Sequence, residues 1–237
     1  PESPATLGTF TVPAKVVGDA SFELTAPTSN SNGAFTYTSS NPAVATISGS
    51  TVTIVGAGTT VITATQAASG SLGSASVTAN FVVSFIPPTT AAPTPPARNA
   101  WDVVSVYSNA YTNVTLSELP TEWSQLSEPF ETVSLEGNAT WRFKGQFLGM
   151  VTNYDNGIDL TSMTTMHIDY WTPDTNRIDL KLVNTVNGGE AFTALEDPTV
   201  TGTWRSIDIP LTAYGTLNRS KITQILIDPA GVSNVYI

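Results

Sequence analysis

The residues with the clearest potential for chemistry are tryptophans, and all five lie in the second part of the 237-residue chain. Six of the seven tyrosines lie there too, within residues 98–237. An indole ring offers a large, flat apolar face and one N–H donor at its edge. Such rings suit a ligand that has apolar faces and polar edges, so a binding site is expected in this region. The tryptophans are Trp101, Trp123, Trp141, Trp171 and Trp204.

Two of these tryptophans have neighbours that favour a binding role. Trp123 lies in LSELPTEWSQLSEPF, which has the composition of a loop, and loops often carry functional residues. Trp141 lies in ATWRFKGQFLGM, where Arg142 and Gln146 add long hydrogen-bond donors. An aromatic ring beside such donors could stack on a ligand and hydrogen-bond its edges. We therefore predict that Trp123, Trp141, Arg142 and Gln146 contact a ligand.

Alternation along MTTMHIDYWTPD assigns two further candidates. Successive strand residues point to opposite faces, so the alternate residues from Met166 to Tyr170 are expected in the core. The other face then carries His167 and Trp171. Each side chain either contacts a ligand or has a structural role, and a structural role is the more common one for a lone histidine on a strand. Tyr154, in the turn TNYDNG, is a candidate for the rim of the site.

The ligand class is narrowed by charge and by the motifs that the sequence lacks. The net charge of −10 argues against nucleic acid and against anionic membrane surfaces, both of which attract lysine and arginine clusters. The sequence contains no cysteine, and it shows no paired-carboxylate signature, phosphate loop or nucleophile elbow. Sugar rings present C–H faces and hydroxyl edges. A non-catalytic, neutral-glycan binder is therefore the expected class.

The elements that position these residues are predicted to be strands throughout. Short runs of alternating apolar and polar residues recur along the chain, bounded by turn residues such as Asn156–Gly157 and Asn187–Gly188, and no sustained helical repeat occurs. We predict an all-β protein with an immunoglobulin-like sandwich over residues 5–85 and a jelly-roll sandwich over residues 98–237.

A proline-rich stretch separates the two predicted domains. Residues 86–97 contain little besides Pro, Thr and Ala, and such segments form extended, semi-rigid spacers of about 3.1 Å per residue. The ten residues from Pro87 to Pro96 would span about 30 Å. We predict a rod that holds the two sandwiches apart; the alternative is a disordered linker.

The first domain resembles a known repeat family. The stretch YTSSNPAVATISGSTVTIVGAGTTVITAT, Tyr37 to Thr65, is similar to bacterial immunoglobulin-like group-2 repeats, which share its Ser-Asn-Pro turn and its GAGT segment. This resemblance implies an immunoglobulin-like fold and a spacer or adhesive role.

The second domain resembles jelly-roll modules of secreted Bacteroidetes glycoside hydrolases and of surface glycan-binding lipoproteins from polysaccharide-utilisation systems. The segments that carry this resemblance are DVVSVYSNAYTNV, MTTMHIDYWTPD, WRSIDIPL and ITQILID. It implies a monomeric carbohydrate-binding module, with β-1,3-glucan of the laminarin type as the first ligand to consider. It further implies tethering at the outer membrane by a lipidated cysteine upstream of Pro1, and glycan-importer components as partners.

The same resemblance implies a structural calcium ion at the edge of the sandwich. Its ligands would come from YSNAYTN, namely Ser108, Asn109 and Asn113, with an acidic residue near the C-terminus. Asn109 stands where related modules often have aspartate.

Two alternative functions remain open at this stage. The final run NVYI has the pattern of a strand, which predicts that the natural chain continues beyond Ile237. The chain could then be an accessory binding fragment of a larger secreted glycoside hydrolase. The second alternative is a structural or adhesive surface protein whose aromatic residues serve only its core.

Overall fold

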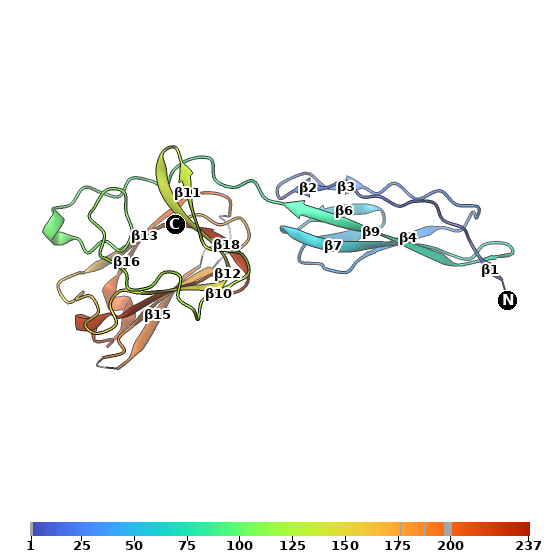
Figure 1. The fold of residues 1–237 in the computed structure, drawn as a ribbon. Coiled ribbons are helices and arrows are strands. Elements are labelled where there is room, and N and C mark those ends of the chain that lie inside the picture. The colour runs from blue at the N-terminus through green and yellow to red at the C-terminus, as the bar shows by residue number, and fades with distance from the viewer. Residues whose placement is uncertain (1, 176, 187, 197–200) are drawn as a thin grey trace. The chain divides into compact units, whose positions relative to one another are not determined.

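A computed structural model describes residues 2–175, 177–186, 188–196 and 201–237. The chain divides into two compact units, Pro1–Ile86 and Pro87–Ile237, each of which contains its own sheets (Figure 1). Within the described residues the helical segments are short 3-10 turns, η1 (Ala100–Asp102), η2 (Leu211–Tyr214) and η3 (Arg219–Lys221). The predicted all-β sandwich fold is confirmed. No helix among these residues is long and apolar enough to span a membrane.

The first unit is a sandwich of a four-stranded and a three-stranded sheet. The four-stranded sheet has the order β2-β9-β7-β4, and the three-stranded sheet has the order β3-β6-β5. The strands are β1 (Ser3–Pro4), β2 (Lys15–Val16), β3 (Phe22–Glu23), β4 (Phe35–Ser39), β5 (Ala45–Ser48), β6 (Thr51–Ile54), β7 (Gly58–Gln66), β8 (Leu72–Gly73) and β9 (Ala75–Ser84).

Alternation along the long strands builds the core of this unit. On β7 the side chains of Ile62 and Ala64 are fully buried, and on β9 those of Phe81 and Val83 are buried. These residues belong to one apolar cluster that includes residues from both sheets. The predicted Ser-Asn-Pro turn is held by Thr60, whose Oγ1 accepts from the Asn41 backbone N–H at 2.9 Å.

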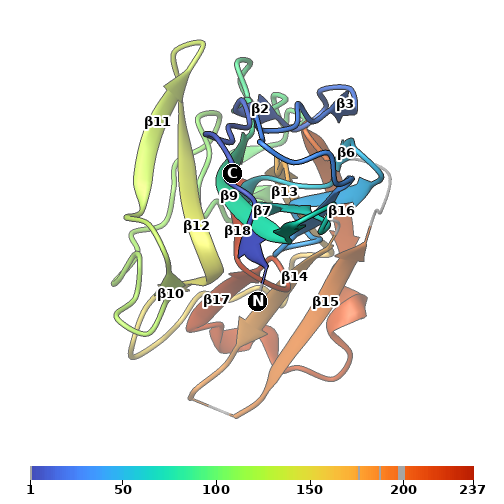
Figure 2. The ribbon, with the colours of Figure 1, turned by 90° about the vertical axis from the view of Figure 1, so that its right-hand side faces the viewer.

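The second unit has a larger antiparallel sheet with the order β10-β12-β17-β14-β15, to which β11 and β18 add along β12 (Figure 2). A separate pair, β13-β16, faces it. The strands are β10 (Gln125–Leu126), β11 (Glu131–Leu135), β12 (Asn138–Val151), β13 (Thr165–Tyr170), β14 (Arg177–Val183), β15 (Glu190–Glu196), β16 (Arg205–Pro210), β17 (Gln224–Asp228) and β18 (Ser233–Tyr236).

The core of the second unit lies between these two sheets. Leu180 and Ile225 come from the larger sheet, and Ile168 and Ile209 come from the pair β13-β16; all four are buried in one cluster. The expected core positions Ile168 and Tyr170 are buried, as alternation predicts. Asn187, part of a predicted Asn-Gly turn, lies outside the described residues.

Part of the proline-rich segment is hydrogen-bonded to the rest of the second unit. The Thr90 carbonyl accepts a hydrogen bond from Trp204 Nε1 at 2.8 Å, and the Pro96 carbonyl accepts from the Tyr111 hydroxyl at 2.6 Å. The Ala91 N–H donates to Glu136 Oε2 at 3.1 Å. Residues 90–96 are therefore tied to the rest of the second unit by three hydrogen bonds, through two carbonyls and one N–H. Trp204 serves this contact.

Candidate binding face and cavity

The outer face of the larger sheet carries a row of side chains that sequence analysis did not single out. On β14 and β17 the core positions alternate with Lys181 and Leu226, which therefore point away from the core. The strand register links these positions into a row. Leu226 on β17 lies between Gly149 on β12 and Lys181 on β14. Lys181 in turn lies opposite Phe192 on β15. Phe192 is 55% exposed. The row thus crosses four strands, a distance of about 14 Å at ~4.8 Å per strand.

Trp123 completes this row at the β12 end. A Cβ built on Gly149 would lie 2.2 and 2.3 Å from two carbons of the indole six-membered ring, so the ring occupies the space where a side chain would project. The loop is fixed beside β12 because the Gly149 N–H donates to Ser124 Oγ at 2.9 Å. The Trp123 side chain remains 39% exposed. The ring is thus held in place and partly open to solvent, and its contact with a ligand stays a prediction.

Tyr154 lies in the turn after β12 and contacts the loop that carries Trp123. Its hydroxyl donates to the Glu118 carboxylate, which also accepts from the Glu122 backbone N–H at 2.8 Å, next to Trp123. The Tyr154 hydrogen bond is the main cause that lowers the pKa of Glu118, and the same bond raises the pKa of Tyr154. The structure therefore brings Tyr154 and Trp123 to one loop cluster.

Charged side chains in the row and beside it form local ion pairs. Arg177 Nε lies 2.7 Å from Asp179 Oδ1, and Lys181 Nζ lies 3.2 Å from Glu190 Oε1. Each pair neutralises its own charge yet leaves donors and acceptors at the surface. The face thus combines aromatic and aliphatic contact area with hydrogen-bonding groups, while carrying little unpaired charge in its centre.

Trp141 and Trp171 are corrections to the predicted ligand-contacting set. Trp141 is 8% exposed, and its ring stacks on Tyr107 with centroids 3.9 Å apart. It faces inward because it shares the alternation of the fully buried Phe143. Trp171 is 4% exposed and packs edge-on against Tyr236, 5.4 Å away. It pairs with Tyr236 beyond the end of β13, so the outer-face assignment does not extend to it.

Arg142 has a structural set of partners. It is in ion pairs with Glu128 and Glu131, and its Nη2 donates to Asn234 Oδ1 at 3.1 Å. Hydrogen bonds from Lys144 and Arg142 lower the pKa of Glu128. These contacts join β12, β18 and the segment around Glu128. The guanidinium group of Arg142 is therefore engaged in contacts within the protein. Gln146 is exposed on β12.

His167 lies on the pair β13-β16. Its Nδ1 is 2.7 Å from Asp208 Oδ1, and its Nε2 is 3.2 Å from Asp169 Oδ2. Both ring nitrogens are thus engaged by carboxylates of its own sheet. The structure does not bring His167 into the Trp123 row, because His167 lies on the pair β13-β16, whereas the row lies on the outer face of the larger sheet.

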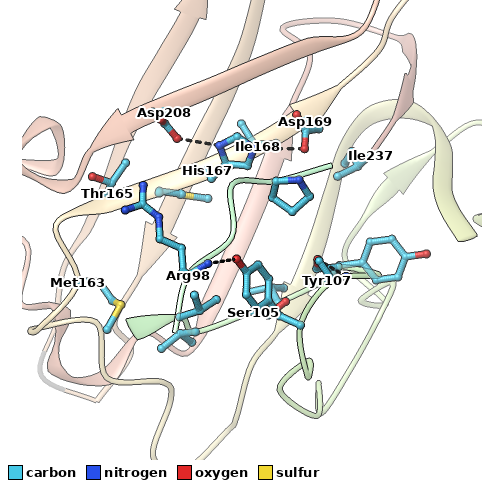
Figure 3. A pocket seen from close by; sticks show the side chains of 18 of the residues that line it. Arg98, Ser105, Tyr107, Met163, Thr165, His167, Ile168, Asp169, Asp208 and Ile237 are labelled. Atoms are coloured by element: carbon cyan, nitrogen blue, oxygen red, sulfur yellow. Dashed lines mark hydrogen bonds and ion pairs between the residues drawn. The ribbon is translucent and has the colours of Figure 1, made fainter. Parts of the chain in front are cut away.

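A cavity of about 900 Å³ opens beside β13, between this pair and the larger sheet (Figure 3). Its inner part is aliphatic, with Leu180, Leu182, Ile225 and Ile227, and Trp141 also contacts it. Trp101, which is 80% exposed, stands at its border. Two buried polar atoms next to it, the Tyr107 hydroxyl and Asp169 Oδ1, have no hydrogen-bond partner among the described residues.

The proposed calcium ligands take part in the hydrogen bonds of their own loop. Asn113 Oδ1 accepts from Ser105 Oγ at 2.6 Å, and Ser108 Oγ accepts from the Ala110 N–H at 3.0 Å. Asn109 turns its amide nitrogen to the Ala139 carbonyl at 3.3 Å. In the described part of the chain no three His, Cys, Asp or Glu side chains gather as a metal site. Calcium binding at this loop stays a prediction, since a calcium site also needs further oxygen ligands.

Comparison with known proteins bears on the first unit. Residues 24–68 match the model of the family described as "Intimin, immunoglobulin-like domain". No curated protein matches the chain. The predicted immunoglobulin-like sandwich in the first unit is thus supported, and the protein is an all-β chain with this sandwich followed by a second one.

Two solved structures align with limited similarity. One is the family 11 carbohydrate-binding module of the cellulosomal cellulase Lic26A-Cel5E of Clostridium thermocellum, at 15% identity and a TM-score of 0.36, covering 53% of this chain and 91% of that one. The other holds the CBM51-2 and INT domains of Clostridium perfringens ZmpB, at 6% identity and a TM-score of 0.23, covering 98% of this chain and 48% of that one.

Proposed function

We propose that the second unit binds a neutral polysaccharide, without catalysis, on the outer face of its larger sheet. The observation that carries this proposal is the row formed by Trp123, Leu226, Lys181 and Phe192. Trp123 is fixed over Gly149 with its ring partly open to solvent, and Phe192 is exposed at the opposite end. A sugar chain that crosses the strands could stack on both aromatic rings and hydrogen-bond the polar groups between them.

The charges on this face support a neutral ligand. Arg177 is paired with Asp179 and Lys181 with Glu190, so cationic groups that could attract an anionic polymer are already neutralised. Hydroxyl groups can still hydrogen-bond to such pairs, since carboxylates accept and ammonium or guanidinium groups donate. The net charge of −10 also disfavours polyanions.

The carboxylates on this face support binding rather than hydrolysis. Asp179 and Asp228 lie opposite each other in register on neighbouring strands. Asp179 is held by Arg177, and Asp228 Oδ1 accepts from the Ala230 N–H at 2.7 Å. They project from one sheet face, whereas glycoside hydrolysis needs two carboxyl groups on either side of the scissile bond.

Within this proposal, β-1,3-glucan of the laminarin type is the first ligand to test. The setting that we propose is the bacterial cell surface, where a tethered binder would pass captured glycan to importer components. The immunoglobulin-like unit would then act as a spacer between the tether and the binding unit.

The test is affinity electrophoresis of the whole chain against a panel of neutral polysaccharides, laminarin included, with an acidic polysaccharide for comparison. We expect retardation by at least one neutral polymer, and its loss in Trp123→Ala. Trp101→Ala is the matched control, since Trp101 is exposed in the same unit but lies outside the row. A folded protein that no neutral polymer retards would show that the proposal is wrong.

A further inference from the structure

Two carboxylates lie beside the Trp123 row on the same outer face of the larger sheet. Asp179 comes two residues before Lys181 on β14, and both side chains point away from the core. Asp228 comes two residues after Leu226 on β17, with the same consequence. Strand register places Asp179 opposite Asp228 on these neighbouring strands (Figure 2). The two carboxylates thus run alongside the row, about 7 Å away at ~3.4 Å per residue, and we call them the acceptor line.

Arg177 fixes the direction of the Asp179 carboxylate. Its Nε donates to Oδ1 at 2.7 Å and its Nη2 donates to Oδ2 at 2.9 Å, so both oxygens are held by one planar group. The Asp179 side chain remains 18% exposed. An ionised carboxylate has roughly four acceptor sites, so each oxygen can accept a further hydrogen bond. Asp179 is therefore a pre-oriented acceptor at the surface.

Asp228 offers a carboxylate oxygen that no described residue occupies. Its Oδ1 accepts from the Ala230 N–H at 2.7 Å, which holds the side chain in a local turn. Within the described part of the chain, neither a hydrogen bond nor an ion pair engages Oδ2. The residue is partly exposed. Because an ionised carboxylate can only accept, Oδ2 requires a donor from water or from a ligand.

The opposite side of the row has a different character. There Gln224 on β17 lies between Val151 on β12 and Val183 on β14. Glu190 on β15 lies opposite Val183, and its carboxylate is paired with Lys181. This side thus presents two aliphatic side chains, one amide and one carboxylate that already has a cation. A sugar ring over the row would meet open carboxylate acceptors along one edge only.

A line of acceptors selects for ligand groups that donate. A free sugar hydroxyl can donate to a carboxylate, and such charge-assisted hydrogen bonds are stronger than neutral ones. An O-methyl group has no hydrogen to donate, so it would shield the Asp228 oxygen from water without replacing the lost hydrogen bond. A sulfate group would also be repelled by the negative charge. Binding strength should therefore depend on free hydroxyl groups along this edge.

Building on the proposed glycan function, we propose that the acceptor line determines which glycans this face accepts. The ligand would be a neutral glycan whose hydroxyl groups are free along the edge that passes Asp179 and Asp228. Its O-methylated and sulfated counterparts would be rejected. Trp123 and Phe192 would supply contact area for the rings, whereas Asp228, with its open oxygen, would be the main specificity-determining residue.

The test is isothermal titration calorimetry of the whole chain with two probes. One is an oligosaccharide of the neutral polymer that retards the chain, with β-1,3-glucan taken first, and the other is its O-methylated derivative. We expect the derivative to bind at least about tenfold more weakly. In Asp228→Asn an amide that donates replaces the open acceptor, so affinity for the unsubstituted probe should fall about tenfold. Affinity for the derivative should change less than about twofold, so the ratio of the two affinities shrinks.

Asp208→Asn is the matched control, because Asp208 is an exposed aspartate of β16, away from the row, with a side chain 60% exposed. It should leave both affinities within about twofold of the unaltered chain. Equal binding of the two probes by the unaltered chain, or an unchanged ratio in folded Asp228→Asn, would overturn the role of the acceptor line and leave glycan binding intact. Absence of binding to every neutral polymer would instead refute the proposed function, and this inference with it.

Discussion

Replacing Trp123 by alanine is the substitution with the most direct expected effect on glycan binding. The residue is 39% exposed, and a tryptophan presents about 250 Å² of surface, so about 100 Å² is open to a ligand. At about 25 cal/mol per Å², complete coverage of that area would contribute about 2.5 kcal/mol, and half coverage about 1.2 kcal/mol. The Kd should therefore rise between about eightfold and about sixtyfold.

The assay is isothermal titration calorimetry with an oligosaccharide of the polymer that retards the chain in electrophoresis. Circular dichroism and thermal melting show whether each variant is folded. The matched control, Trp101→Ala, removes a more exposed indole from the same unit and should change the Kd less than about twofold. A folded Trp123→Ala protein with unchanged affinity would refute the reasoning, as would an equal loss in the control.

Three further predictions concern packing and charge. In Gly149→Ala the new methyl group would overlap the Trp123 ring. We therefore expect the free energy of unfolding in urea to fall by about 1 to 3 kcal/mol and glycan binding to weaken. Unchanged stability and affinity would contradict the placement of the ring. Trp171→Ala removes a buried ring and should cost about 3 to 5 kcal/mol in the same assay, without a selective loss of affinity in the protein that remains folded. The pKa of Glu128 is lowered in the folded protein, mainly by its hydrogen bond from Lys144. The ionised Glu128 side chain therefore stabilises the fold above about pH 4.5, and this stabilisation is lost as the pH falls through the lower folded-state pKa. The difference in melting temperature between the unaltered chain and Glu128→Gln should therefore be largest near neutral pH and shrink in acid, and a constant difference would rule this out.

The sequence predicted the strands and much of their sidedness. Alternation alone placed Ile168 and Tyr170 in the core, and both are buried. This prediction succeeded because a strand half-buried in a sandwich has one apolar and one polar face. The resulting two-residue period is visible in the amino-acid sequence. The loop composition around Trp123 pointed to a functional residue, and its ring is partly exposed.

The register between strands could not be predicted in the same way. Leu226, Lys181 and Phe192 form a row only because β17, β14 and β15 are neighbours in the sheet with a particular register. Their alternation within each segment was visible, and it could have marked them as outward-facing. Which outward residues come together depends on long-range pairing, which local patterns do not encode.

The errors over Trp141 and Trp171 have a related cause. Each tryptophan has polar neighbours in sequence, such as Arg142 beside Trp141, but its own face packs on a ring from a distant segment, Tyr107 or Tyr236. Arg142 is itself used in ion pairs with Glu128 and with Glu131 of β11. Composition near a tryptophan thus gave no measure of how deeply its ring is buried.

The central claim is that glycan lies across the outer face of the larger sheet. Its most direct test is a titration of the isotopically labelled chain with oligosaccharide, followed by backbone amide chemical shifts in NMR. Shifts should concentrate at Gly149, Leu226, Lys181 and Phe192 and in the Trp123 indole N–H. Shifts concentrated instead at His167 and the border of the cavity, or an absence of saturable shifts, would contradict it.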